Sequence, residues 1–198
     1  MKIIGITGPT GAGKSLLSSC LEAKGIPIID ADSVYHDMLL PPSECLNAIR
    51  RAFGNKIFSC DGKLDRAKLA SIVFSSKEKL DLLNRTVLGN VLCEIRLLIS
   101  DYRRQGFDAV AVDAPTLIES GFHKECSIVI SVLAPAELRM KRIIERDSLS
   151  PEKAALRVNA QKSDEFYTQN SHYVLINDGD TEKFKSEVSV LLEKLGLD

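Results

Sequence analysis

The sequence predicts an α/β fold in which a five-stranded, mostly parallel sheet is covered by helices on both faces. Short apolar segments alternate with helical ones along the chain, which is the order of elements in α/β proteins. The apolar segments are continuous runs, as expected for strands that are buried on both faces. With 198 residues and 44% hydrophobic side chains, the chain is long enough to bury such a core.

The first part of the chain predicts two strands around one helix. Residues 2–7 form an apolar run that stops at a Gly-rich turn, so a buried strand is expected there. A helix is expected over 15–24, with Gly25 in the position of a C-terminal cap. A second apolar strand is expected over 26–29, and Asp30 ends it.

The middle of the chain, from residue 40 to residue 105, changes to a helical pattern. Apolar residues recur at helical spacing from 77 to 104, and Gly89 interrupts the run, which allows one bent helix or two. This segment is too long for a plain crossover between strands. We therefore expect a helical lobe at about 60–105, inserted into a single domain that spans 1–198.

The last part of the chain returns to strands and helices in alternation. Three short apolar strands are expected at 109–112, 127–133 and 173–176. Three helices are expected at 135–147, 151–162 and 181–195.

Composition excludes several classes of protein. Lys and Arg number 26 and Asp and Glu 27, so the basic excess of a general nucleic-acid binder is missing. No apolar run approaches the length of a membrane-spanning helix. The five cysteines contain no C-x-x-C pair, so idle thiols in the cytoplasm are expected rather than a zinc site. They are Cys20, Cys45, Cys60, Cys93 and Cys126.

A phosphate-binding loop follows the first predicted strand and opens the first predicted helix. Residues 8–15, Gly-Pro-Thr-Gly-Ala-Gly-Lys-Ser, match G-x-x-x-x-G-K-[ST] in full. Glycines let the backbone N–H groups wrap around phosphate, and the helix N-terminus adds partial positive charge. Lys14 is expected to reach the β- and γ-phosphates and Ser15 to hold Mg²⁺. The motif predicts a nucleoside triphosphate ligand and leaves the phosphate acceptor open.

Carboxylates stand where predicted strands end, which is the edge at which open α/β sheets bind ligands. Asp30 and Asp32 follow the second strand, and Asp113 ends the third in a run that resembles a Walker B strand. One of the first pair is a candidate base for an acceptor hydroxyl. The alternative is that Asp30 or Asp32 merely caps the next helix. Asp113 is a candidate for orienting the metal, the alternative being a surface carboxylate.

A basic helix follows the fourth strand. Arg139, Arg142 and Arg146 are spaced i, i+3 and i+7, so they share one helix face. Such a face can close over a triphosphate as a lid, expected at about 139–165, and neutralise charge during phosphoryl transfer. The alternative is a solvated charged face.

The motifs together resemble the dephospho-CoA kinase family over nearly the whole chain, in order and with compatible spacing. The resemblance begins with the phosphate loop and Asp30-Ala31-Asp32. Further matches are Phe53-Gly54, Asp61 to Arg66 with Leu69 and Phe74, Asp113 to Glu119, Arg142, Arg146-Asp147, Arg157, Gln161, Asn177 and Gly179.

The resemblance implies a P-loop NTPase fold of the nucleotide-kinase type and ATP-dependent phosphorylation of the ribose 3′-hydroxyl of dephospho-CoA. Asp32, Lys14, Arg142 and Arg146 would then be catalytic, with Asp32 as base or hydroxyl orienter. The implied nucleotide-binding residues are Gly8, Gly11, Ala12, Gly13, Lys14, Ser15, Leu16 and Asn177. The implied substrate contacts are Asp32, Arg66, Glu119 and Arg157, and the implied Mg²⁺ ligands are Ser15 and Asp113.

The sequence also departs from the family pattern while keeping the phosphate-transfer core. The departures are Leu16, Leu88-Gly89, Thr116, the stretch Ser163–Asn170 without its usual basic residues, and Ile176.

Two other classes of function remain as alternatives. One is another small-molecule kinase for a nucleoside or nucleotide, which the ordered middle motifs disfavour. The other is an ATP-binding regulator without catalysis, which the joint presence of Lys14, Asp32 and the lid arginines disfavours. A guanine-specific N-K-x-D motif is missing, so a GTPase switch is not expected. Partners other than small molecules are not expected, and the chain is expected to be a monomer or a weak homo-oligomer.

Overall fold

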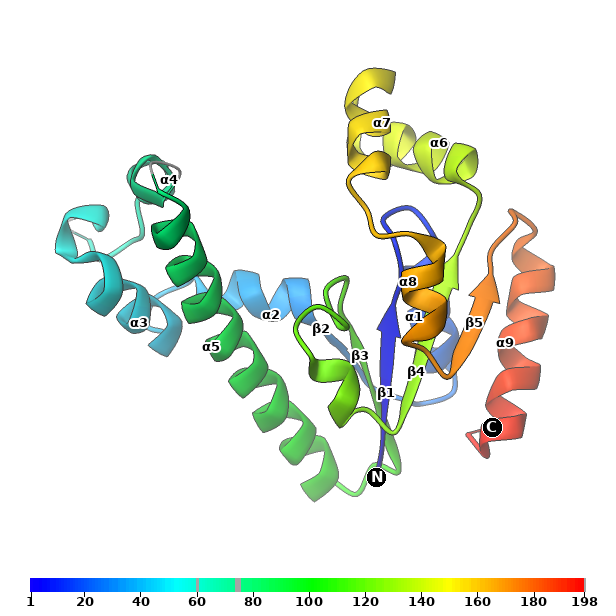
Figure 1. Ribbon diagram of the computed structural model, residues 1–198. Coiled ribbons are helices and arrows are strands. Elements are labelled where there is room, and N and C mark those ends of the chain that lie inside the picture. Colours follow the sequence, from blue (N-terminus) through cyan, green and yellow to red (C-terminus); the bar gives the residue numbers. More distant parts are fainter. Residues whose placement is uncertain (60, 74–75, 198) are drawn as a thin grey trace. The chain divides into compact units, whose positions relative to one another are not determined.

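The computed structural model describes residues 1–59, 61–73 and 76–197 (Figure 1). The sequence predictions for Cys60 and Phe74 lie outside the described residues. The strands are β1 (Lys2–Thr7), β2 (Ile28–Asp30), β3 (Ala109–Asp113), β4 (Ile128–Leu133) and β5 (Tyr173–Ile176). The α-helices are α1 (Lys14–Ala23), α2 (Ala31–Met38), α3 (Glu44–Phe53), α4 (Arg66–Val73), α5 (Lys77–Arg104), α6 (Ala136–Asp147), α7 (Pro151–Asn159), α8 (Asp164–Gln169) and α9 (Thr181–Leu195).

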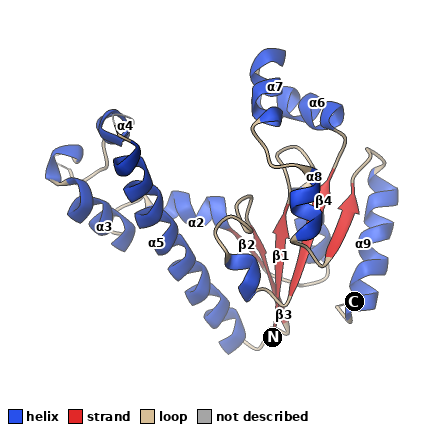
Figure 2. Cartoon of the chain, in the orientation of Figure 1, coloured by secondary structure: helices blue, strands red, loops and turns tan. Residues whose placement is uncertain are grey.

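The sheet has five strands in the order β2-β3-β1-β4-β5, which confirms the predicted α/β class (Figure 2). β1 pairs in parallel with β3 on one side and with β4 on the other, and β4 pairs in parallel with β5. Because the strands run in parallel, the loops that leave β1, β3 and β4 all emerge at one edge of the sheet. This edge carries the phosphate loop.

The structure decides between one helix and two at 77–104, and it differs from the prediction at 151–162. Lys77–Arg104 is one 28-residue helix, so Gly89 does not break it. The reason is that the buried positions Val91 and Ile95 continue the apolar face, and one glycine costs only about 1 kcal/mol. The helix predicted to end at 162 ends at Asn159, and Ser163 caps a further short helix, α8, by accepting a hydrogen bond from Phe166 N.

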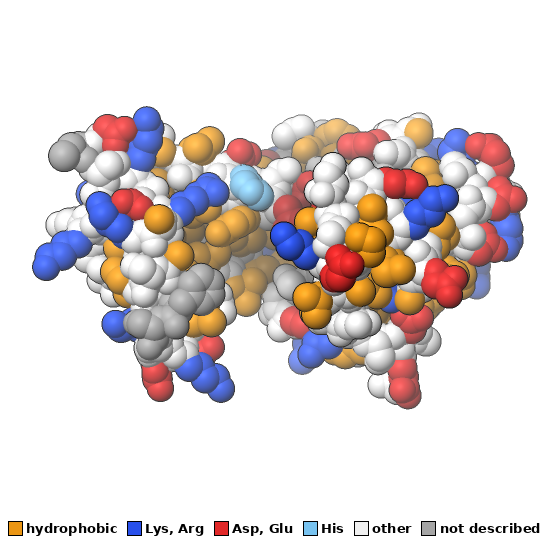
Figure 3. All heavy atoms as spheres, turned by 90° about the horizontal axis from the view of Figure 1, so that it is seen from above, with side chains coloured by type: hydrophobic (Ala, Val, Ile, Leu, Met, Phe, Trp, Pro, Cys, Tyr) orange, Lys and Arg blue, Asp and Glu red, His pale blue; other side chains and the backbone are white. Residues whose placement is uncertain are grey.

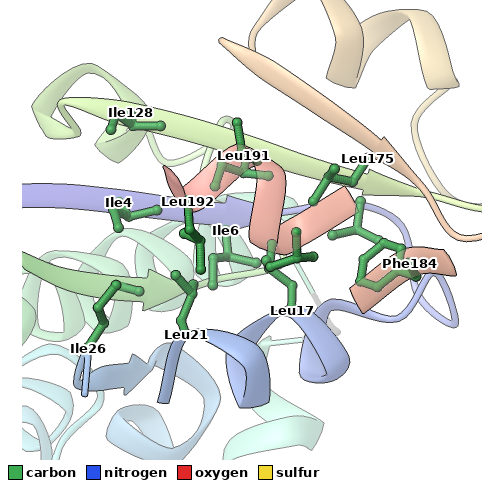
Figure 4. Packing of buried hydrophobic residues seen from close by; sticks show 14 of the residues in the cluster. Ile4, Ile6, Leu17, Leu21, Ile26, Ile128, Leu175, Phe184, Leu191 and Leu192 are labelled. Carbon is green, nitrogen blue, oxygen red and sulfur yellow. The ribbon is translucent and has the colours of Figure 1, made fainter. Parts of the chain in front are cut away.

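The main core lies between the sheet and the helices α1 and α9. Leu17 and Leu21 of α1 and Leu192 of α9 are at most 1% exposed. Figure 4 shows these side chains close to Ile4 and Ile6 of the central strand β1. α1 is therefore fixed firmly to the sheet, and the phosphate loop is held at both of its ends.

A smaller cluster forms with α8. Leu133 at the end of β4 and Ile118, in the segment after β3, pack with the nearly fully buried Tyr167. This cluster fixes α8 and the segment after β3 beside the phosphate-loop edge.

The chain divides into two compact units, one of residues 1–29 and 102–198 and one of residues 30–101. The second unit is all helical apart from isolated bridges, within the residues described, and has its own apolar core. Its buried residues are Leu39, Cys45, Leu46, Ile49, Ile57, Leu69 and Val73. It begins earlier than the predicted lobe because α2 and α3 contribute to this core.

The surface carries both signs of charge. On the face drawn in Figure 3, Lys and Arg side chains are interspersed with Asp and Glu over each unit, which agrees with the net charge of −1. Among the described helices, none has the length and apolar character needed to cross a membrane.

Candidate active site

The phosphate loop connects β1 to α1, as the sequence predicts, and its glycines are required by close contacts. Gly8, Gly11 and Gly13 have φ values of +137°, +77° and +106°, which favour glycine. A Cβ on Gly8 would lie 2.2 Å from Val132 O, and one on Gly13 would lie 2.1 Å from Asn177 Nδ2. Neighbouring elements thus leave space for backbone only.

Two side chains from different elements donate hydrogen bonds to carbonyl groups of the loop. Asn177 follows β5, is 3% exposed and donates from Nδ2 to Ala12 O at 3.0 Å. Arg142 of α6 donates from Nη1 to Gly11 O at 3.1 Å and to Ala12 O at 3.3 Å. Because the C=O and N–H of a trans peptide point in opposite directions, fixing Ala12 O also fixes the direction of the Gly13 N–H. Both side chains therefore set the shape of the phosphate cradle.

Lys14 opens α1 and folds back over the loop. Its Nζ donates to Gly8 O at 2.9 Å and lies 3.4 Å from Pro9 O. The ammonium therefore stands at the mouth of the loop, beside the N-terminus of α1, where positive charge attracts phosphate.

Ser15 and Asp113 provide hard oxygen atoms of the kind that Mg²⁺ prefers. The Asp113 carboxylate at the end of β3 accepts a hydrogen bond from Ser18 Oγ at 2.9 Å. Ser18 lies one turn after Ser15 on α1, so Asp113 lies beside the first turn of that helix. The residues present fit a magnesium ion at this point of the loop.

The two carboxylates after β2 have different environments, which decides the alternative left open by the sequence. Asp30 is the N-cap of α2, because its side chain accepts hydrogen bonds from Asp32 N at 2.9 Å and from Ser33 N at 3.3 Å. Asp32 lies in the first helical turn and is exposed. The side chain that caps the helix is therefore that of Asp30, and Asp32 is not the cap.

A small network of ion pairs lies at the C-terminal end of the basic helix α6. Arg146 donates two hydrogen bonds to Asp147, at 2.7 and 2.9 Å, and Arg157 of α7 donates to the same carboxylate at 2.6 Å. The hydrogen bonds from Arg146 and the charges of both arginines lower the pKa of Asp147. Asp147 therefore joins α6 to α7 and holds two of the arginines predicted for the site.

Two further residues that the sequence analysis singled out, Gln161 and Arg139, also lie in this region. Gln161 Oε1 accepts a hydrogen bond from Thr10 N at 3.1 Å, which joins the loop to the segment after α7. Arg139 is only 7% exposed, so the alternative of a solvated face is wrong for this residue. Its spacing of three residues from Arg142 was the one signal for it in the sequence.

Arg66 and Glu119, both predicted substrate contacts, lie in different units. Arg66 lines a mostly apolar cavity of about 190 Å³ within the helical unit, together with Tyr35 and Leu69. Glu119 is exposed in the segment after β3. Burial and the charge of Glu119 raise the pKa of Tyr167 to about 12.

Comparison with known proteins agrees with this geometry. The family model for dephospho-CoA kinase matches residues 2–183. A dephospho-CoA kinase of Symbiobacterium thermophilum is 36% identical over 188 residues, covering 95% of this chain and 79% of the relative. One from Carboxydothermus hydrogenoformans is 34% identical over 194 residues, covering 98% and 94%.

Solved structures give the same result. The dephospho-CoA kinase of Campylobacter jejuni superposes with a TM-score of 0.71 at 27% identity and covers 98% of each chain. The predicted P-loop kinase fold and the predicted transferase class are thereby confirmed. With its phosphate loop complete and residues 2–183 matched by the family model, the chain belongs to the dephospho-CoA kinase family.

Proposed function

We propose that this protein transfers the γ-phosphoryl group of ATP to the ribose 3′-hydroxyl of dephospho-CoA, giving coenzyme A. The observation that carries the proposal is a complete phosphate loop, gripped by Arg142 and Asn177, in a chain that matches this kinase family over residues 2–183. Phosphoryl transfer needs positioning and charge neutralisation more than covalent chemistry from the protein. The loop supplies both.

The loop residues bind and orient the triphosphate. Backbone N–H groups and the α1 N-terminus face the phosphates, with Lys14 on the β- and γ-phosphates. Gly8, Gly11, Ala12, Gly13 and Leu16 shape this cradle. Ser15 and Asp113 would hold Mg²⁺, which, when bound, neutralises charge on the β- and γ-phosphates.

Asp32 aligns the acceptor hydroxyl and takes its proton as the oxygen attacks phosphorus. Its carboxylate is exposed and, unlike that of Asp30, is not used as a helix cap. Arg142 and Arg146 would stabilise the negative charge that develops on the transferred phosphoryl group. Closure of the lid around them would exclude water. Arg66, Glu119 and Arg157 are proposed contacts to the substrates.

An acceptor panel tests the proposal. ADP release is measured with ATP and Mg²⁺ in the presence of dephospho-CoA, adenosine, AMP or no acceptor. We expect release that depends on dephospho-CoA and is lost in Lys14→Met. Release with another acceptor alone would indicate a different small-molecule kinase. ATP binding without release for any acceptor would indicate a regulator.

A further inference from the structure

Arg139, on α6, is a buried cation with unused hydrogen-bond donors. The residue as a whole is 7% exposed to solvent. Within the described part of the chain, its Nε and Nη1 atoms are buried and make no hydrogen bond. Buried polar groups in folded proteins are nearly always paired, and a buried charge without a partner is costly. These two donors therefore need an acceptor that the protein itself does not supply.

The backbone and Cβ of Arg139 lie against the phosphate loop. A Cβ placed on Gly11 would lie 2.8 Å from Arg139 O, 3.1 Å from its Cα and 3.2 Å from its Cβ. This contact is one reason why position 11 must be glycine. The first atom of the Arg139 side chain, Cβ, is thus close to the loop that is expected to bind phosphate.

The guanidinium acts on groups at the same edge of the sheet. Its positive charge lowers the pKa of Tyr167 on α8, against burial and the charges of Glu119 and Asp164, which raise it. Among the described residues, Arg139 Nε and Nη1 form no hydrogen bond with either carboxylate. Residues 163–170 contain no Lys or Arg, so Arg139 brings positive charge to α8 from a neighbouring helix.

Contacts on both sides hold this part of the structure together. Thr10 N donates to Gln161 Oε1, which joins the loop to the segment that leads into α8. Tyr167 packs with Ile118 and Leu133, which joins α8 to the segment after β3. The elements around the loop are thus joined to one another. Because the Arg139 side chain is itself buried, most of the entropy cost of ordering it for a ligand is already met.

We infer that Arg139 binds the terminal phosphate of the nucleotide in the loop, donating from Nε and Nη1 to two of its oxygens. This inference rests on the proposed function. The backbone of Arg139 lies against Gly11 of the loop. Its charge acts on Tyr167, which packs with Ile118 in the segment that follows Asp113 at the end of β3. In phosphate-loop enzymes that strand-end carboxylate lies near the β- and γ-phosphates, so the anion on this side is the terminal phosphate. The planar donor pair of arginine matches two phosphate oxygens.

The test compares two nucleotides that differ only in the terminal phosphate. Affinities of Arg139→Met for the ATP analogue AMP-PNP and for ADP are measured by calorimetry in the presence of Mg²⁺. Loss of a charged hydrogen-bond pair predicts about 10- to 100-fold weaker binding of AMP-PNP. ADP affinity should stay within about threefold of the parent protein, since its phosphates do not reach Arg139. Lys141→Met is the matched control, because it removes an exposed charge from the same helix and should change neither affinity.

Equal losses for both nucleotides, or no loss for AMP-PNP, would overturn the inference. If the parent protein phosphorylates dephospho-CoA while Arg139→Met binds AMP-PNP normally, only this inference fails. If the parent binds neither nucleotide, the proposed function fails as well. Should Arg139→Met not fold, NMR of the Arg139 Nε–H group in the unmodified protein decides. Its resonance should move strongly with AMP-PNP and little with ADP, and an unmoved resonance with AMP-PNP would contradict the assignment.

Discussion

Arg142 Nη2 donates a hydrogen bond to Asn177 Oδ1 at 2.8 Å, and both residues also bond to Ala12 O. The three residues come from α6, the end of β5 and the phosphate loop, so this contact joins α6 to the phosphate loop. Burial slightly disfavours the charged guanidinium, and so lowers the pKa of Arg142. The nearby carbonyl oxygens compensate for that burial. The loop is therefore already shaped before a nucleotide arrives.

Asn177→Ala should weaken ATP binding. The change removes the donor to Ala12 O and leaves part of Arg142 without its acceptor, which costs about 1–3 kcal/mol. We expect a rise in the KM for ATP of about tenfold and a lower melting temperature. Steady-state kinetics at varied ATP concentration measures the first effect.

Asn170→Ala is the matched control for Asn177. Asn170 also donates to one backbone carbonyl, Phe166 O at 2.8 Å, but on α8 rather than at the loop. This variant should lose some stability and keep its KM for ATP. Equal KM values for Asn177→Ala and the parent would show that Asn177 has no part in shaping the cradle.

Asp32→Asn and Asp30→Asn should differ strongly in their effect on turnover. Loss of a positioned base predicts a fall in kcat of about 100- to 10,000-fold for Asp32→Asn, with ATP affinity kept. Asp30→Asn keeps a side chain that can cap a helix, so its turnover should stay near that of the parent. Single-turnover kinetics with a nucleotide titration checks both. Normal turnover in Asp32→Asn would remove this residue from the mechanism.

Asp147→Asn should loosen α7 in a pH-dependent way. Arg146 and Arg157 lower the pKa of Asp147 in the folded protein. Its carboxylate therefore stabilises the fold at pH values above the pKa that an Asp side chain has in the unfolded chain, which is about 4. This contribution is lost as the pH falls through the folded pKa. We expect a lower melting temperature than the parent at neutral pH, and a difference that shrinks below about pH 4.

Hydrogen exchange provides the local measurement for Asp147. Amides of α7 should exchange a few times faster in Asp147→Asn, while Asp37→Asn, which changes an exposed carboxylate in the helical unit, should leave α7 unchanged. A difference in melting temperature that stays constant down to acid pH would contradict the role of the carboxylate.

The cysteines should differ sharply in reactivity. Burial raises the pKa of Cys126 to about 12, so hardly any thiolate forms at neutral pH, whereas Cys93 is exposed on α5. A thiol reagent followed by peptide mass spectrometry should modify Cys93 within minutes and Cys126 only after denaturation. Rapid modification of Cys126 in the native protein would show that its surroundings open readily.

Much of the fold could be predicted because many strands and helices are indicated by short patterns within their own residues. The run at 173–176 and the helix at 181–195 match β5 and α9 in full, since an apolar run and an amphipathic period are local signals. Gly89 left one helix or two open in the sequence, because glycine propensity is a small term and tertiary packing decides the outcome. The short helix α8 has too few residues for a periodic pattern, so only its Ser163 cap signalled it.

The site was predictable in its motifs and not in its contacts. A fixed spacing reveals Lys14 and Ser15. By contrast, nothing in the sequence shows that Asp30 caps α2 while Asp32 stays free, because both residue types cap helices well. Likewise, the burial of Arg139 cannot be read from its spacing on the helix, because it depends on segments that come together only in the folded protein.

The central claim is the transfer of one phosphate to dephospho-CoA, and the direct test is the mass and structure of the product. The purified protein is incubated with ATP, Mg²⁺ and dephospho-CoA, and the product is analysed by mass spectrometry and phosphorus NMR. We predict one added phosphate, attached at the ribose 3′-oxygen, in an amount equal to the ADP released. ADP formed without a phosphorylated acceptor, or a phosphate attached elsewhere, would contradict the account.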